Sequence, residues 1–102
     1  MLLAVDCGNT NTVFAVFDGD TQRGQWRIAT DPRRTSDEYA VWLTQLMSLR
    51  GLQVGDIENA IVTTVVPGTR RNLDSLLESH FGVTPLVIRD SIVDLGIEIL
   101  VE

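Results

Sequence analysis

The chain opens with three strand-like segments and then alternates helical and strand-like segments, and this order restricts its fold more than any other feature. Residues 2–5 form a short, continuous apolar run, which is typical of a strand buried on both faces. Residues 12–17 are β-branched and aromatic, and residues 22–29 follow them after a hairpin signal at residues 18–20. These three segments predict an antiparallel meander.

A helix should follow the meander, because Thr35 and Glu38 have the spacing of a capping box. Apolar residues then recur at helical spacing up to Gly51, a suitable helix end: Tyr39, Trp42, Leu43, Leu46 and Met47. This stripe is best explained by packing against a core.

Strand and helix then alternate once more. Residues 60–66 are rich in branched side chains and end before Pro67, which favours a strand. Thr69 is expected to cap a second helix, which ends at Gly82 and presents the apolar residues Leu73, Leu76, Leu77 and Phe81. Residues 86–88 form the fifth expected strand.

The resulting order, β-β-β-α-β-α-β, predicts an α/β fold with a mixed five-stranded sheet and helices packed on its faces. Right-handed crossover connections leave only a handful of topologies. By analogy, one of them is the ribonuclease H-like fold, which is also the repeating half of the actin-like kinases. The 102 residues are enough for one small domain of this kind, over residues 1–102.

The net charge and the lengths of the apolar segments limit which partners and which cellular compartment we expect. The chain has 8 basic and 14 acidic residues, and a net charge of −6 argues against non-specific nucleic-acid binding. No stretch is long enough to cross a membrane, and the apolar start is too short for a signal peptide, so we expect a cytoplasmic protein without a membrane partner. Residues 95–102 are apolar almost to the end, which favours a piece of a longer chain; a terminal strand docked on the sheet is the alternative.

The segment from residue 6 to residue 12, Asp-Cys-Gly-Asn-Thr-Asn-Thr, carries the chemistry. A tight turn of small residues can point several backbone N–H groups one way, which forms a nest for anionic oxygens. Gly8 lets the backbone approach a ligand, and the following side chains add donors: Asn9, Thr10, Asn11 and Thr12. Asp6 can hold Mg²⁺ through water, and the metal bridges to phosphates. These are parts that phosphoryl transfer needs.

The motif differs from the two common nucleotide-binding loops. It has no Gly-Lys-Ser/Thr of a Walker A loop. The turn leads into a strand, whereas the turn of a Rossmann fingerprint leads into a helix. Taken alone, the motif is also compatible with a plain hairpin.

The same segment resembles the first phosphate motif of type III pantothenate kinases, a Bvg accessory factor-like family of the actin-like kinase superfamily. Further similarity to this family lies at residues 26–31, 34–39, 65–67 and 81–87. The resemblance covers essentially the whole chain at similar spacings. Position 7 departs mildly from it, because Cys7 stands where family members often have an aliphatic residue.

The resemblance implies a kinase that transfers the γ-phosphate of ATP to pantothenate in coenzyme A synthesis. It implies Mg²⁺, a monovalent cation such as K⁺ or NH₄⁺, and a homodimer at full length. The family's ATP-phosphate segment maps onto Asp6, Gly8, Asn9, Thr10, Asn11, Thr12 and Val13, with Asp6 at the metal.

The resemblance also implies what this chain lacks. The family's Gly-Ala-Asp-Arg motif, with its catalytic aspartate, should follow Glu102, and so should the second actin-like domain. We therefore expect an N-terminal phosphate-binding domain without catalytic residues, inactive alone. Two alternatives remain open. One is a non-catalytic phosphate-binding or regulatory domain, since family members have been described as transcriptional activators. The other is a ribonuclease H-type nuclease, which would need several carboxylates around two metals, whereas only Asp6 ends a core strand.

Overall fold

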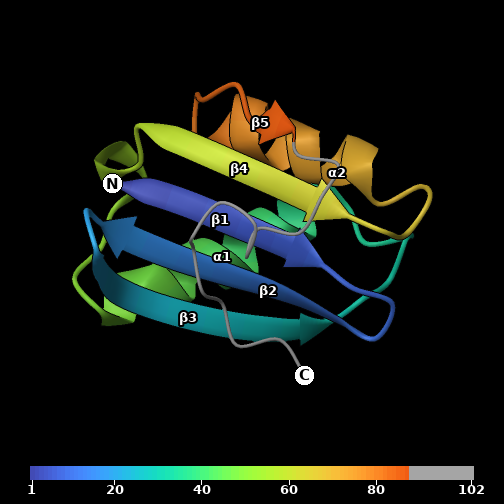
Figure 1. Cartoon of the computed structure of the whole chain (residues 1–102), viewed down its shortest axis with the longest axis horizontal. Coiled ribbons are helices and arrows are strands. Elements are labelled where there is room, and N and C mark those ends of the chain that lie inside the picture. The colour runs from blue at the N-terminus through green and yellow to red at the C-terminus, as the bar shows by residue number, and fades with distance from the viewer. Residues whose placement is uncertain (88–102) are drawn as a thin grey trace.

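The computed structural model describes residues 1–87 of the chain, and a single mixed sheet dominates this part (Figure 1). Its strand order is β3-β2-β1-β4-β5. The strands are β1 (Leu2–Cys7), β2 (Asn11–Asp18), β3 (Thr21–Ala29), β4 (Asn59–Thr64) and β5 (Leu86–Val87). The expected five-stranded mixed sheet is confirmed.

Helices cover one face of this sheet, as Figure 1 shows. They are α1 (Ser36–Leu49), α2 (Arg70–Ser75) and the π-helical turn η2 (Leu76–His80) that continues α2, with a short 3₁₀ turn, η1 (Val54–Asp56), before β4. Strand β2 runs antiparallel to both β1 and β3, whereas β4 runs parallel to β1 and β5 parallel to β4. Consequently β1, β3 and β4 all end at the same edge of the sheet, where β2 begins.

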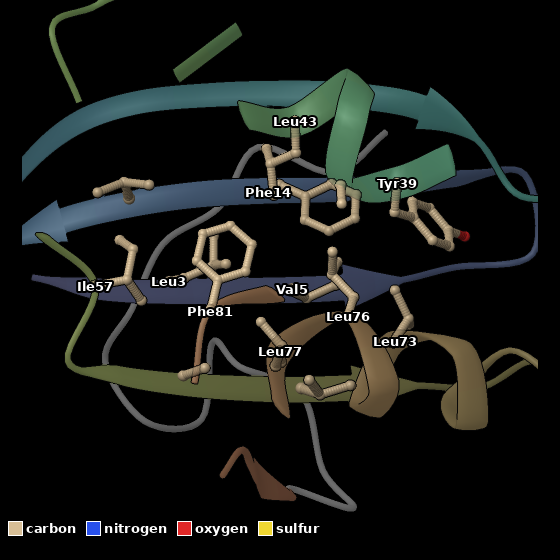
Figure 2. Packing of buried hydrophobic residues seen from close by; sticks show 14 of the residues in the cluster. Leu3, Val5, Phe14, Tyr39, Leu43, Ile57, Leu73, Leu76, Leu77 and Phe81 are labelled. Carbon is tan, nitrogen blue, oxygen red and sulfur yellow. The ribbon is translucent and has the colours of Figure 1, made fainter. Parts of the chain in front are cut away.

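The main core lies between the sheet and the helices, because alternate strand residues point to opposite faces. Leu3, Val5 and Phe14 face the helices. They pack against one apolar stripe of α1 and another of α2 and η2 (Figure 2). The predicted stripes are confirmed for Tyr39, Leu43, Met47, Leu73, Leu76, Leu77 and Phe81, all of which are buried. A second, smaller cluster lies on the opposite face and consists of Ala4, Val13, Ala15 and Ile61.

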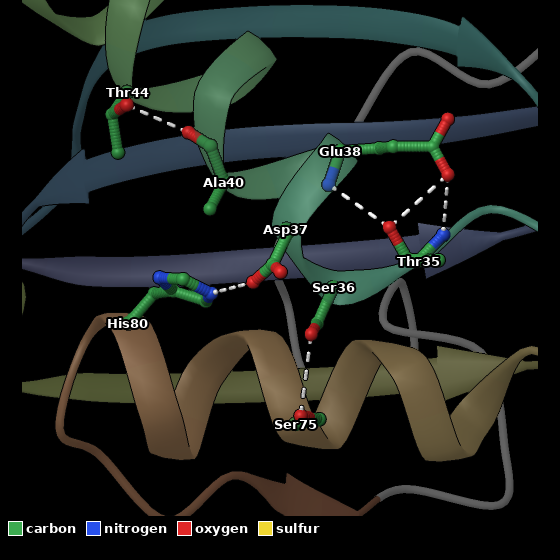
Figure 3. Close-up of polar contacts among 8 residues, drawn as sticks. All are labelled: Thr35, Ser36, Asp37, Glu38, Ala40, Thr44, Ser75 and His80. Atoms are coloured by element: carbon green, nitrogen blue, oxygen red, sulfur yellow. Dashed lines mark hydrogen bonds and ion pairs between the residues drawn. The ribbon is translucent and has the colours of Figure 1, made fainter.

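Helix α1 begins with the predicted capping box (Figure 3). The Glu38 N–H donates to Thr35 Oγ1 at 3.2 Å, and the Thr35 N–H donates to Glu38 Oε1 at 2.9 Å. These two bonds satisfy donors that a helix start otherwise leaves unpaired. The Asp37 carboxylate at the same helix end lies 2.9 Å from His80 Nε2, so polar contacts join α1 to the end of η2.

The second helix differs from its prediction in two respects. Thr69 does not cap it with its side chain: its backbone is already helical, at φ −82° and ψ −29°, and its hydroxyl donates instead to the Val66 carbonyl at 2.8 Å. The α-helical part ends at Ser75 and continues as a π-helix. Strand β4 also ends at Thr64, two residues before the predicted end. Ile88 and the apolar segment 95–102 lie outside the described residues.

Candidate phosphate-binding site

The predicted phosphate segment is the connection between β1 and β2, at the edge of the sheet where β1, β3 and β4 end. Cys7 and Thr12 are the last paired residues of the two strands. Beyond them the Gly8 N–H donates to the Asn11 carbonyl at 2.9 Å, which closes a tight turn. A Cβ at Gly8 would lie 3.3 Å from that carbonyl oxygen. The crowded turn therefore favours glycine at this position.

The loop is fastened to the end of β3 by one residue, Thr30. Its N–H donates to the Thr10 carbonyl at 2.9 Å, and its hydroxyl donates to the Gly8 carbonyl at 2.8 Å. The carbonyl groups of Gly8 and Thr10 therefore both accept hydrogen bonds from the same residue, on the side of the loop that faces Thr30.

A row of small polar side chains lies behind the loop and joins the strand ends. Thr12 Oγ1 lies 2.9 Å from Thr30 Oγ1 and 3.3 Å from Cys7 Sγ. Cys7 Sγ in turn lies 3.5 Å from Thr69 Oγ1, which is 2.8 Å from Thr64 Oγ1. The row runs from β3 through β2 and β1 to the end of β4, so the loop rests on a continuous polar contact.

The predicted phosphate-binding residues differ in what they offer a ligand. Asn9 and Thr10 are exposed, and Asn9 has no hydrogen-bond partner among residues 1–87. Gly8 and Asn11 are half-buried. Thr12 is fully buried and its hydroxyl is engaged inside the protein, so it supports the loop from behind and is not placed as a side-chain donor to phosphate. Val13 is also buried, in the second cluster.

Asp6 lies one residue before the end of β1, paired with Val13 on one side and Thr63 on the other. It shares its sheet face with Ala4, on the side away from the helices. Burial raises the pKa of its half-buried carboxyl group above the ordinary value. A carboxylate held partly out of water in this way favours a cation beside it, because a cation restores the solvation that burial removes.

Asp6 fits Mg²⁺ better than it fits a metal with many protein ligands. Within residues 1–87 no group of three or more His, Cys, Asp or Glu side chains comes together. Mg²⁺ keeps several waters and uses one or two carboxylates together with substrate phosphates. A lone carboxylate beside a candidate phosphate loop fits that donor set.

No local pattern predicted the contacts that Thr30, Thr64 and Thr69 make behind the loop, although Thr30 lies in the family-like segment 26–31. Thr30 bonds to Gly8 across 22 residues, and a contact between such distant positions leaves no local pattern.

A groove of about 520 Å³ between β3 and α1 is lined by Ile28, Arg34, Asp37, Glu38, Val41 and Trp42. None of the predicted phosphate-binding residues lines it. In the described part of the chain, no helix is both long and apolar enough to cross a membrane.

Comparison with known proteins identifies the lineage of this loop. The sequence model described as "Type III pantothenate kinase" matches residues 2–102. The chain belongs to the type III pantothenate kinase family. It is 55% identical over 102 residues to a type III pantothenate kinase of Rhodospirillum centenum, and 57% identical over 102 residues to that of Rhodospirillum rubrum. These alignments cover 100% of this chain but only 39% and 40% of the relatives, so the chain spans about two fifths of their length.

Solved structures of low sequence identity share the fold. A putative N-acetylglucosamine kinase of Porphyromonas gingivalis matches with a TM-score of 0.58 at 16% identity, over 85% of this chain and 34% of that protein. YeaZ of Pseudomonas aeruginosa matches with a TM-score of 0.62 at 14% identity, over 87% of this chain and 43% of that protein. These likenesses confirm the predicted actin-like α/β fold.

Proposed function

We propose that this chain is the N-terminal, ATP-phosphate-binding part of a pantothenate kinase, which phosphorylates pantothenate in coenzyme A synthesis. The observation that carries the proposal is the loop after β1, anchored by its carbonyl groups and leaving Asn9 exposed, in a chain whose family match runs over residues 2–102. The relatives carry that activity in their names.

The chain's own residues would bind and orient the triphosphate of ATP. Backbone N–H groups of the loop, with the side chains of Asn9 and Thr10, which are exposed, would face the phosphates. Asp6 would hold Mg²⁺ through water. When bound, the metal supplies neutralisation of phosphate charge. A monovalent cation, K⁺ or NH₄⁺, and a homodimer at full length belong to the same proposal by resemblance to the family.

The remaining parts of the reaction would come from a second domain and from the Gly-Ala-Asp-Arg motif expected beyond Glu102. Phosphoryl transfer depends on positioning and charge stabilisation, so it needs both walls of a cleft. No observation favours the alternative of a non-catalytic regulatory domain.

The test is a chimaera in which this chain replaces the aligned N-terminal part of the Rhodospirillum rubrum relative. We expect ATP-dependent formation of phosphopantothenate by the chimaera with Mg²⁺ and K⁺ present. A folded chimaera that shows no such activity, beside an active parent enzyme, would contradict the proposed function.

The loop itself is tested by Gly8→Val in this chimaera. A Cβ at Gly8 would lie 3.3 Å from the Asn11 carbonyl oxygen, so the turn must shift by a few tenths of an ångström, and we expect this shift to disturb the alignment of its N–H groups. We expect kcat/KM for ATP to fall by about 10²-fold or more, as when preorganised donors are removed. The matched control is Gly55→Val, where a Cβ meets nothing within 4 Å. Equal activities of the two variants would place the phosphate cradle elsewhere.

A further inference from the structure

The loop's orientation depends on a residue outside the phosphate motif. Thr30 bonds two loop carbonyls, Thr10 through its N–H at 2.9 Å and Gly8 through its hydroxyl at 2.8 Å. In a planar trans peptide the C=O and N–H groups point in opposite directions. A carbonyl held toward Thr30 therefore turns the next N–H, that of Asn9 or of Asn11, away from Thr30.

Thr30 is itself held firmly. The Arg34 guanidinium donates to the Ala29 carbonyl at 3.0 Å and lies 5.8 Å from the centre of the Tyr39 ring. The Arg34 carbonyl accepts a hydrogen bond from Asn72 of α2 at 2.8 Å. The segment after β3 is thus tied to its own strand and to both helices, in addition to the bonds that Thr30 makes to the loop.

The hydroxyl of Thr30 has one proton, and it is donated to the Gly8 carbonyl. With the Thr30 proton on the Gly8 carbonyl, the single Thr12 proton serves the shorter 2.9 Å contact with Thr30 Oγ1, and the 3.3 Å approach of Thr12 Oγ1 to Cys7 Sγ is then a packing contact. Thr30 accepts from the strand behind the loop and donates to the loop in front. Without this hydroxyl, the Gly8 carbonyl keeps only a long 4.0 Å side-chain contact from Cys7 Sγ, so the first loop peptide is held less firmly.

We propose that Thr30 is a positioning residue for phosphate binding, which aims the backbone N–H groups of the β1–β2 loop at the ATP phosphates without touching them. This inference rests on the proposed function. It assigns to the end of β3 a part of the ATP site that lies outside the motif of residues 6–13.

The test compares Thr30→Val with Thr30→Ser in the chimaera described above. Valine matches threonine in shape but cannot donate, whereas serine keeps the hydroxyl. Loss of one such hydrogen bond should raise KM for ATP about three- to tenfold. We expect this for Thr30→Val, with KM for pantothenate unchanged, and a KM for ATP within about twofold of the unmutated value for Thr30→Ser.

The matched control is Thr44→Val, which removes a hydroxyl that donates to the Ala40 carbonyl at 2.6 Å within α1 (Figure 3). It should leave both KM values unchanged. If Thr30→Val does not fold, Thr30→Cys replaces it, because a thiol is a weaker donor and should raise KM for ATP relative to serine.

The outcomes separate the inference from the function on which it rests. An active chimaera whose Thr30→Val variant has a lower melting temperature but an unchanged KM for ATP would overturn the inference and leave the proposed function standing. A folded chimaera without ATP-dependent activity would overturn both. An equal rise in KM for ATP and for pantothenate would show general loosening and would also overturn the positioning role.

Discussion

At the scale of single residues, Asp6 combines two opposed effects. Its place near the end of β1 puts a carboxylate beside the candidate phosphate loop, and the same place takes that carboxylate partly out of water. Burial raises its pKa, so the folded chain holds the proton more tightly than the unfolded chain does. Ionised Asp6 therefore lowers stability at neutral pH in the absence of a metal.

Asp6→Asn should accordingly stabilise the folded chain, and in the chimaera it should lower kinase activity. Below the unfolded-state pKa both variants are neutral at this position and should melt alike. As the pH rises through the raised folded-state pKa, the free energy of unfolding of the unmutated chain falls relative to the variant. We expect the variant to melt about 1–4 °C higher at pH 7, a small gain because the group is half exposed.

Thermal unfolding between pH 3 and pH 8 without Mg²⁺ measures this difference. The same substitution in the chimaera should lower kinase activity by about 10²-fold or more, because the charge facing the metal is lost. The prediction is contradicted if the melting temperature of the variant at pH 7 lies below that of the unmutated chain while the two agree at pH 3.

A second residue-scale feature is the indole of Trp26 lying over Gly24 in β3. A Cβ at Gly24 would lie 2.5 Å from the far edge of the ring, well inside contact distance. Trp26 packs against the main core, so the ring cannot move without disturbing that packing. The glycine makes room for the tryptophan.

Gly24→Ala should therefore destabilise the chain by about 1–3 kcal/mol, the usual cost of overpacking. Chemical denaturation of the 102-residue chain measures it. Gly55→Ala is the control, since its new methyl group would meet nothing within 4 Å. A cost at Gly24 no larger than at Gly55 would mean that the ring shifts freely.

At the scale of elements, α1 is specified by short-range chemistry. Its capping box consists of two reciprocal bonds between Thr35 and Glu38, and the pKa of Glu38 lies below its ordinary value because the Thr35 backbone N–H and then its hydroxyl donate to the carboxylate. This arrangement fixes where the helix begins. Because Asp37 contacts His80 from the same turn, the start of α1 also sets its contact with η2.

Thr35→Ala should lower the free energy of unfolding by about 0.5–2 kcal/mol, the usual cost of losing an N-cap. Thr44→Ala is a control in the same helix, because alanine has the higher helix propensity and Thr44 caps nothing, so it should be close to neutral. Urea denaturation of both variants decides the matter, and equal effects would mean that the box contributes no stability.

The elements that the sequence predicted correctly depend on local patterns, and those it missed do not. The α1 stripe and its cap follow from spacings of three and four residues, and both are present. The π-helical turn η2 was not predicted, since Leu73, Leu76, Leu77 and Phe81 also fit an ordinary α-helix. The same distinction holds at the site: the loop was located by its residue types, whereas Thr30 reaches it across 22 residues.

At the scale of the whole molecule, the sheet gathers its chemistry at one edge. Strands β1, β3 and β4 end there, and residues at or just beyond these ends, Cys7, Thr30 and Thr64, belong to the row of hydroxyl and thiol groups behind the loop. Ligands of open α/β sheets bind outside the carboxyl ends of the strands. We therefore propose that the chain forms one wall of a cleft and that a second domain forms the other.

The 102-residue chain alone should not phosphorylate pantothenate at a measurable rate. It carries the proposed phosphate wall, but Asp6 is proposed to hold the metal, and the N-terminal carboxylates of α1 are engaged, Glu38 by Thr35 and Asp37 by His80. A missing general base alone costs about 10²–10⁴-fold. The assay is phosphopantothenate formation with ATP, Mg²⁺ and K⁺. Turnover equal to that of the chimaera would show that the catalytic residues lie within this chain.

The register of the sheet bears on how the chain is made. Leu2 pairs with Phe17, 15 residues on, and with Asn59, 57 residues on. Each doubling of the length of a closed loop costs about 0.6 kcal/mol in chain entropy. Closing the loop for the parallel pairing therefore costs about 1.2 kcal/mol more than closing the hairpin. A nascent chain also completes β1, β2 and β3 before β4 is synthesised. The candidate phosphate loop and Thr30, which bonds to its carbonyl groups, both precede β4 in the chain, so they are synthesised before the parallel pairing can form.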